Sequence, residues 1–258
     1  MSNVINLVSE SVFSEKMDAQ NAFLAAIAAN TGNPVVNSWA DVQVLVRAGL
    51  ADKVFSVGDI LICSRNGTAV AWDIVGIDCD IPTDKNFTHS LTLQTHKSFT
   101  VMAFDTAGSN EWRTSSLREW LNNSQNGFVS GLDSDFTAVL GAVDKITAVH
   151  DETDSSVMVA DISSDLFFIP SRTEYFGTQT FGVAEGVRYP YYTGNNDRIK
   201  YKDNSSQILL YYSRSAAFVS GGSAPSTNRI YLVNGQTGSE TTIAVPGYYG
   251  VAPACCVV

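Results

Sequence analysis

The chain ends on the stretch that decides its fold, RIYLVNGQTGSETTIAVPGYYGVAPACCVV, residues 229–258. Before it, residues 208–222 have the sequence ILLYYSRSAAFVSGG. The hydrophobic runs 208–212 and 230–233 are separated by Gly, Ser, Asn and Pro, which is typical of strands joined by turns. The last run, 251–258, is apolar, and burying each valine or cysteine in it is worth roughly 1–3 kcal/mol. We therefore expect the C-terminus to insert as a strand into a sheet and to belong to the core.

Upstream, residues 38–49 predict a short helix. Ser38 with Asp41 three residues later resembles a capping box, and Gly49 is placed to end the helix. Strand-like runs follow at 53–56, 60–64, 69–77 and 91–95.

A β-hairpin is predicted over residues 60–77. The dipeptide Asn66-Gly67 lies between two of the strand-like runs, and Asn-Gly is the strongest short sequence preference for a hairpin turn.

In the second half of the chain, the segment 116–122 predicts a helix capped by Thr114 or Ser115. A second helical stretch is predicted over 134–143. The run 166–169 predicts a strand, and SRTEYFG at 171–177 has the pattern of a helix start. Residues 177–207 have little periodicity, which inside a compact domain indicates a functional surface or a lid.

Composition limits the function. Of the 258 residues only 16% are charged, against about 25% in typical domains. The net charge is −10 and no basic stripe occurs, which argues against nucleic acid as a partner. We expect no membrane span, since no 18 apolar residues run together, and no secretion signal. Release inside an assembled particle is one route by which such a protein reaches the exterior.

The four cysteines, Cys63, Cys79, Cys255 and Cys256, do not have the spacing of a zinc site, and we expect buried free thiols. His89 and His96 are seven residues apart, so in one strand they would face opposite ways. We therefore predict no metal site and no cofactor.

The N-terminal stretch 13–29 has a helical pattern with a heptad-like seam formed by Phe13, Met17, Gln20, Leu24 and Ile27. A helix this short is marginal alone, so it either docks on its own domain or bundles with copies of itself. The buried amide of Gln20 favours self-association, because it can fix register. We assign these five residues to oligomerisation, with a trimer preferred.

Five segments then resemble successive blocks of a little-characterised domain family found in bacterial surface proteins and phage virion proteins: SLREWLN, DLFFIPSRTEYFG, YYSRSA, IYLVNGQTG and YYGVAPACCV. The resemblance covers about residues 100–258, and the N-terminal region is similar to that of phage structural proteins carrying this domain. It implies a layout similar to the formylglycine-generating-enzyme and C-type-lectin-like folds, in which irregular loops lie over a small twisted sheet. Two positions depart from the family pattern: Ala252 replaces an arginine and Ser213 replaces a leucine.

The resemblance implies a virion component, and three functions remain open. The first is a head fibre, decoration or tail-associated subunit whose loops bind host glycans, because tyrosine rings can stack on the apolar faces of sugars. The second is a capsid cement protein without a ligand. The third is an enzyme on the same fold, disfavoured because its acidic pairs, Asp133/Asp135 and Asp151/Glu152, lie in Ser-rich turns. The candidate ligand-binding residues are Tyr189, Tyr191, Tyr192, Arg214, Tyr248 and Tyr249; for Arg214 the alternative partner is a neighbouring carbonyl or carboxylate.

The sequence thus predicts an α+β fold with short N-terminal helices and a C-type-lectin-like domain built on a twisted, mainly antiparallel sheet with long irregular loops. Residues 1–50 form an anchoring or oligomerisation segment. Residues 51–258 form the β-rich domain, with a hairpin region at 51–100 and a family-like core at 100–258. We expect a non-enzymatic protein without catalytic residues, assembled in the host cytoplasm with other capsid or tail proteins and exposed on the exterior of the virion.

Overall fold

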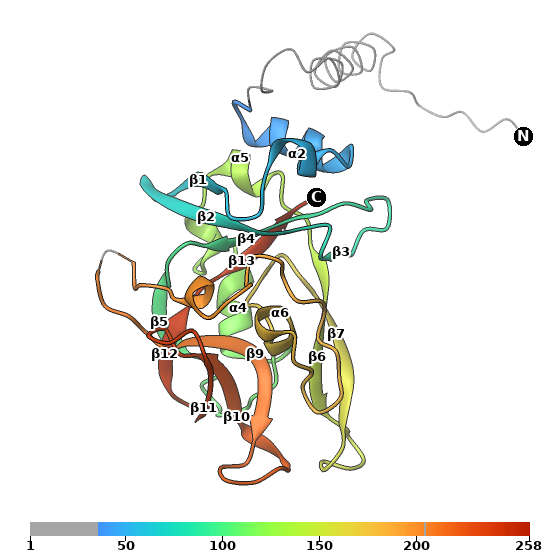
Figure 1. Ribbon diagram of the computed structural model, residues 1–258, viewed down its shortest axis with the longest axis vertical. Helices are drawn as coiled ribbons and strands as arrows, with labels where there is room; N and C mark the ends of the chain where they lie inside the picture. Colours follow the sequence, from blue (N-terminus) through green and yellow to red (C-terminus); the bar gives the residue numbers. More distant parts are fainter. Residues whose placement is uncertain (1–35, 204) are drawn as a thin grey trace, which may run out of the picture.

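The computed structural model describes residues 36–203 and 205–258, and Figure 1 shows their arrangement. The predicted oligomerisation seam at residues 13–27 lies outside this part. The helices are short: α2 (Trp39–Arg47), α3 (Ala51–Val54), α4 (Ser116–Asn122), α5 (Ser134–Thr137) and α6 (Arg172–Phe176), with 3₁₀ turns η1 (Val129–Gly131) and η2 (Asn196–Arg198). None of the helices in the described part is long and apolar enough to cross a membrane.

The strands divide among three sheets, where the sequence predicts one. The first sheet has the order β1 (Ile60–Arg65), β2 (Thr68–Ile77), β4 (Leu91–Thr95), β13 (Ala254–Val257) and β8 (Phe167–Phe168). The second has the order β11 (Glu240–Ala244), β10 (Pro225–Val233), β9 (Tyr211–Phe218), β12 (Tyr248–Val251) and β5 (Thr100–Ala103). The third has the order β3 (Ile81–Pro82), β6 (Val143–His150) and β7 (Met158–Asp165). Pairing between the strands is antiparallel except for one parallel contact between β12 and β9, so the predicted mixed α+β class is confirmed.

The C-terminal strand β13 lies inside the first sheet, between β4 and β8. Cys255 is opposite Leu93 on one side and Phe167 on the other. All residues from Val251 to Val258 are buried. The insertion predicted from the apolar run is confirmed, and its lack of polar alternation follows from burial of the strand on both faces.

The capping box predicted for α2 is present: the Ser38 hydroxyl accepts from the Asp41 amide, and the Asp41 carboxylate accepts from the Ser38 amide. Gly49 ends the helix region at φ +66. The helix packs into the same hydrophobic cluster as the strands, and Gln43 donates to the main-chain oxygen of Val258 at 2.9 Å. The described end of segment 1–50 is therefore part of the domain, because its apolar face completes the core.

The predicted hairpin over 60–77 is confirmed as β1 and β2, with Arg65 opposite Thr68. Asn66 and Gly67 have φ of 50° and 77°, the left-handed values that a two-residue type I′ turn requires.

Two elements differ from the sequence prediction. The expected strand at 53–56 is replaced by α3, a single helical turn that follows α2 directly. The expected helix over 134–143 stops at Thr137, because Leu140 and Gly141 pair with the C-terminal strand instead: Leu140 forms a β-bridge with Val257, and the Gly141 amide donates to the Cys256 carbonyl at 3.0 Å. The helix predicted after Ser115 is confirmed as α4, with the Ser115 hydroxyl as its cap.

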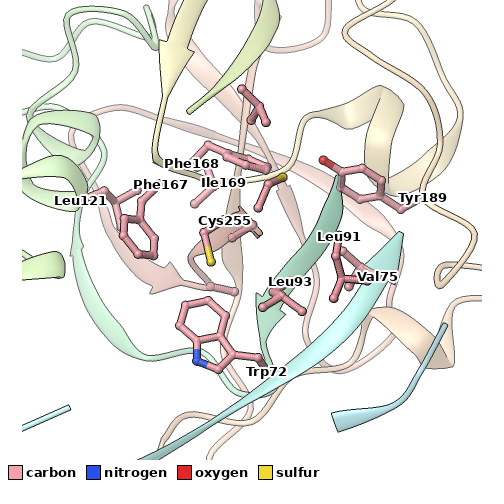
Figure 2. Close-up of a cluster of buried hydrophobic side chains, with 14 of the residues drawn as sticks. Trp72, Val75, Leu91, Leu93, Leu121, Phe167, Phe168, Ile169, Tyr189 and Cys255 are labelled. Carbon is pink, nitrogen blue, oxygen red and sulfur yellow. The ribbon is translucent and has the colours of Figure 1, made fainter. Parts of the chain in front are cut away.

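The hydrophobic core lies against the first sheet. Figure 2 shows Trp72 and Leu93 together with Cys255, and Phe167 with Leu121 of α4. The Trp72 indole donates to the Cys63 sulfur at 3.1 Å, so the buried ring keeps a hydrogen-bond partner. All four cysteines are free thiols; Cys63, Cys255 and Cys256 are buried as predicted, whereas Cys79 is half-buried.

Candidate functional site

Three of the six predicted ligand-binding residues are buried and cannot offer an exposed surface. Tyr189 is 1% exposed and Tyr192 is fully buried, because their hydroxyls bond to Asp80 and to Gln94 in the interior. A buried ring has no free face on which a sugar could stack, so these two assignments were wrong.

Arg214, the third, is fully buried on β9 and forms a two-pronged pair with Glu174 of α6, at 2.5 and 3.0 Å. Its remaining N–H groups donate to the Thr147 hydroxyl and to main-chain carbonyls, among them that of Ile169 at 3.0 Å. The assignment to ligand binding was therefore wrong, and the alternative partners, a carboxylate and carbonyls, are confirmed.

The other three candidates lie nearer the surface. Tyr248, at the start of β12, is 72% exposed, and Tyr249 beside it is half-buried with its ring edge-on to Tyr212. Tyr191 is half-buried, and burial followed by the nearby Asp73 carboxylate raises its pKa to about 12. The structure does not bring the six candidates into one site.

The interior holds a set of charged side chains that we call the buried ionic cluster: Asp80, Lys145, Glu174, Glu185 and Arg214. Each is less than one-tenth exposed. Asp80 precedes β3, Lys145 lies on β6, Glu174 on α6, Glu185 in the segment after α6, and Arg214 on β9. The cluster thus joins the third sheet to the second and, through the hydrogen bond that the Thr92 hydroxyl on β4 donates to Asp80, to the first.

Local sequence explains the position of Glu174. Ser171 and Glu174 form the capping box of α6, in which the Ser171 amide donates to Glu174 Oε2 at 2.8 Å. Gly177 ends the helix at φ +73. The capping box therefore fixes Glu174 at the first turn of α6, where its carboxylate meets Arg214.

Lys145 contacts two carboxylates, those of Asp80 and Glu174, and its Nζ is 2.7 Å from Glu174 Oε1. Burial alone would lower the pKa of Lys145, but the charges of Asp80 and Glu174 more than offset it and raise the pKa above its usual value. Burial would raise the pKa of Asp80, and the Lys145 charge with several hydrogen bonds reverses this and lowers it. The two groups therefore form an ion pair in this state.

Glu185 differs from the other carboxylates of the cluster. Burial raises its pKa, although Arg214 and three hydrogen bonds oppose the shift. Its oxygens accept from the Ala148 amide and the Thr180 hydroxyl, and contact the Ser215 hydroxyl. A proton on Glu185 would leave two cations and two carboxylates in the cluster, which is the charge balance expected in a low dielectric.

Sequence reasoning missed Asp80 and Lys145. The burial of Lys145 could have been predicted from the alternation of side chains along a strand. Lys145 lies on the inward face of β6, between Val143 and Thr147, which are both buried. Asp80 directly precedes the two-residue strand β3 and belongs to no helix or strand itself. No periodicity in the sequence therefore indicates that its side chain is buried.

His89 and His96 contact different aspartates and do not form a common site. His96 Nδ1 lies 2.6 Å from buried Asp73, whose other oxygen is 3.2 Å from Lys200 Nζ, while His89 pairs with Asp78. Within residues 36–203 and 205–258, no group of three or more His, Cys, Asp or Glu side chains is arranged to hold a metal.

The surface has an open groove of about 580 Å³ between α2 and the edge strand β1, lined by Trp39, Leu61, Cys63 and Asp133 among others. Ile60 and Ile62 on β1 are 49% and 64% exposed beside it.

The fold and the buried cluster define a β-rich α+β protein in which internal ion pairs link the second and third sheets and a hydrogen bond from Thr92 links the cluster to the first. Residues 90–258 match the family described as a domain of unknown function, DUF6273, and the chain belongs to that family. Comparisons with curated proteins and with solved structures gave no significant match.

Proposed function

We propose that the protein is a non-enzymatic structural component of a bacteriophage particle, a head fibre, decoration or tail-associated subunit with a lectin-like domain on the exterior. The observation that carries the proposal is the buried ionic cluster. Its charged groups are paired with one another. Glu185 of the cluster, and Tyr189 through its hydrogen bond to Asp80, anchor the long irregular segment 177–207 onto the sheets. A rigid scaffold that fixes long surface loops suits a protein whose role is to be displayed and to bind.

Binding of host surface glycans would use the exposed tyrosine of β12. Tyr248 is the most exposed of the large hydrophobic side chains in the described residues, and Val101 of the neighbouring strand β5 is 36% exposed. An exposed ring with an apolar neighbour can stack on a pyranose face.

The test is binding of the purified full-length protein to a glycan array and to host cells. We expect Tyr248→Ala to abolish binding and Tyr201→Ala to leave it unchanged, since Tyr201 is also exposed, at 46%, but lies outside β12. Equal loss in both variants would contradict a site at Tyr248. No binding by the unmodified protein would exclude adhesion and leave the cement role.

A capsid cement protein without a ligand is the second candidate, favoured by the exposed pair Ile60 and Ile62 on the edge strand β1. Exposed apolar side chains on a sheet edge are suited to contact another protein. We expect Ile60→Ser with Ile62→Ser to prevent incorporation into particles, measured by antibody detection in purified virions, while the purified folded protein keeps its circular dichroism spectrum. Normal incorporation would place the particle contact elsewhere.

The assembly is proposed to be a homotrimer formed through residues 13–27. Light scattering should give a trimeric mass for the full chain and a monomeric mass when Met17 and Leu24 are changed to Asp. Two monomeric masses would mean that this stretch does not assemble the protein and would favour attachment by the particle.

A further inference from the structure

We propose that Lys145 and Asp80 condense into an intramolecular amide bond, with Glu174 as the acid–base catalyst. The Lys145 ammonium contacts Asp80 Oδ1 and lies 2.7 Å from Glu174 Oε1. The Lys145 and Asp80 side chains are 1% and 5% exposed, and that of Glu174 is 1% exposed. The amine, the carboxyl group and a second carboxylate that can move protons are thus held together away from water.

The two oxygens of Asp80 have different surroundings, as an acyl transfer requires. Oδ2 accepts from the Thr92 hydroxyl at 2.6 Å and from the Tyr189 hydroxyl at 2.9 Å. These two donors are placed to hold the negative charge that develops on this oxygen in a tetrahedral intermediate. Oδ1 contacts Lys145, accepts only a longer bond of 3.1 Å from the Tyr189 hydroxyl, and is the oxygen that we assign to leave.

The chemistry balances without any further reactant. A proton passes from the Lys145 ammonium to Asp80 Oδ1, giving a neutral amine beside a carboxylic acid. The nitrogen lone pair attacks Cγ of Asp80, and Glu174 takes the proton released by the nitrogen and passes it to the departing hydroxyl. One C–N bond forms, one C–O bond breaks and one water molecule leaves; no group is oxidised or reduced.

The Lys145 nitrogen is shielded from bulk water, and the ion pair has a desolvation cost that the amide would not have. The ring of Phe168 lies 3.9 Å from Lys145 Nζ and covers the nitrogen. Burying two charges is costly, and condensation replaces both with a neutral amide. The remaining pair, Glu174 with Arg214, is still balanced. Groups held at contact distance also react with effective concentrations far above those of free reactants.

Two other lysine–aspartate pairs show what is special about this one. Lys85 and Asp144 are 2.6 Å apart, but their side chains are 65% and 29% exposed, so water competes at the amine. Lys200 and Asp73 are buried at 3.2 Å, and the further contacts of Lys200 Nζ are the carbonyls of Thr95 and His96, which cannot take a proton from the amine. The nearby imidazole of His96 contacts Asp73 Oδ1, at 2.6 Å, and not the amine.

The bond would join residues 65 positions apart and tie the segment before β3 covalently to β6. This inference goes beyond the proposed function and does not depend on it, although resistance to unfolding would suit a protein on the outside of a particle.

The deciding experiment is the intact mass of the purified full-length protein, measured after denaturation. We expect a mass lower than that of the sequence by one water molecule, allowing for the N-terminal methionine. After proteolysis, fragmentation should identify one branched peptide that joins Asp80 to Lys145. A folded chain with its full sequence mass overturns the proposal, whatever the variants do.

Substitutions of the two proposed partners, with one control, show which residues the amide bond joins. Lys145→Arg should restore the full mass, while Lys85→Arg should keep the deficit, because its exposed pair is not part of the site. Asp80→Asn should change the deficit from one water to one ammonia, since the same amide then forms with loss of the side-chain nitrogen. A deficit of one water that persists in Lys145→Arg would point to a different dehydration and would also overturn the proposal.

Discussion

Arg214 of β9 and Glu174 of α6 face each other as a two-pronged ion pair, with Nη1 2.5 Å from Oε2 and Nη2 3.0 Å from Oε1. Both side chains are excluded from solvent. The same glutamate caps its helix through the Ser171 amide, so one carboxylate fixes the helix start, the ion pair and the position of β9 against α6.

Arg214→Lys should therefore destabilise the protein strongly. Lysine cannot reproduce the planar two-pronged contact, so Glu174 keeps only the Ser171 amide and Lys145 as partners and several carbonyls lose their Arg214 donor. Breaking a buried pair costs about 3–5 kcal/mol. Urea unfolding followed by circular dichroism measures the loss. The matched control is Arg172→Lys, whose pair with Glu240 is partly exposed, and its expected cost is under about 1 kcal/mol. Similar losses for the two variants would contradict a structural role specific to Arg214.

Alanine substitutions at two glycines distinguish the cost of a left-handed backbone from the cost of a steric clash. Gly67 and Gly238 both have positive φ, 77° and 65°, but a Cβ at Gly67 would meet nothing within 4 Å, whereas one at Gly238 would lie 1.7 Å from the Asn195 carbonyl oxygen. Gly67→Ala should cost about 1–2 kcal/mol from the left-handed conformation alone. Gly238→Ala should cost clearly more, because the Asn195 backbone must move. Thermal unfolding of the two variants checks the order, and equal midpoints would contradict it.

The cysteines should react slowly in the folded protein and faster as the pH rises. Burial raises the pKa of Cys63 and of Cys79 to about 11, and raises those of Cys255 and Cys256 well above the usual value. Because the thiolate is the reactive form, alkylation of Cys79, which is only half-buried, should speed up about tenfold per pH unit from pH 8 to its pKa. Rapid labelling of all four thiols at pH 8 without denaturant would contradict this burial.

The same raised thiol pKa values predict that the free energy of unfolding decreases as the pH rises. The unfolded thiols titrate near pH 8.5, roughly the reference value, and the folded ones only near 11 or above. As the pH rises from 8.5 towards 11, the unfolded chain loses these protons first, so the contribution of the thiols to the free energy of unfolding falls through that window.

The sequence predicted the elements whose cause is local. The capping box at Ser38, the Asn66-Gly67 turn and the Ser115 cap depend on residues within a few positions, and all three are present. The helix expected over 134–143 was overextended because pairing of Leu140 and Gly141 with the distant C-terminal strand overrides the local pattern.

The candidate site was predicted less well, because it depends on which faces the topology buries. Tyr189 and Tyr192 have the composition of a surface loop, yet the buried Asp80 and Gln94 supply partners for their hydroxyls. Those partners are 109 and 98 residues away in the chain, so no local pattern could indicate them.

The last prediction tests the strand from which the fold was inferred. Val257 on β13 is fully buried opposite Leu91 of β4, and Val187 in the irregular segment is 54% exposed. Val257→Ala should cost about 2 kcal/mol, from about 0.8 kcal/mol per lost methylene together with the cavity left behind. Val187→Ala should change stability by less than about 0.5 kcal/mol. Both are measured as the shift in urea midpoint at constant slope; an unchanged midpoint for Val257→Ala would mean that β13 is not held between β4 and β8, and the C-terminal run would then need another place in the fold.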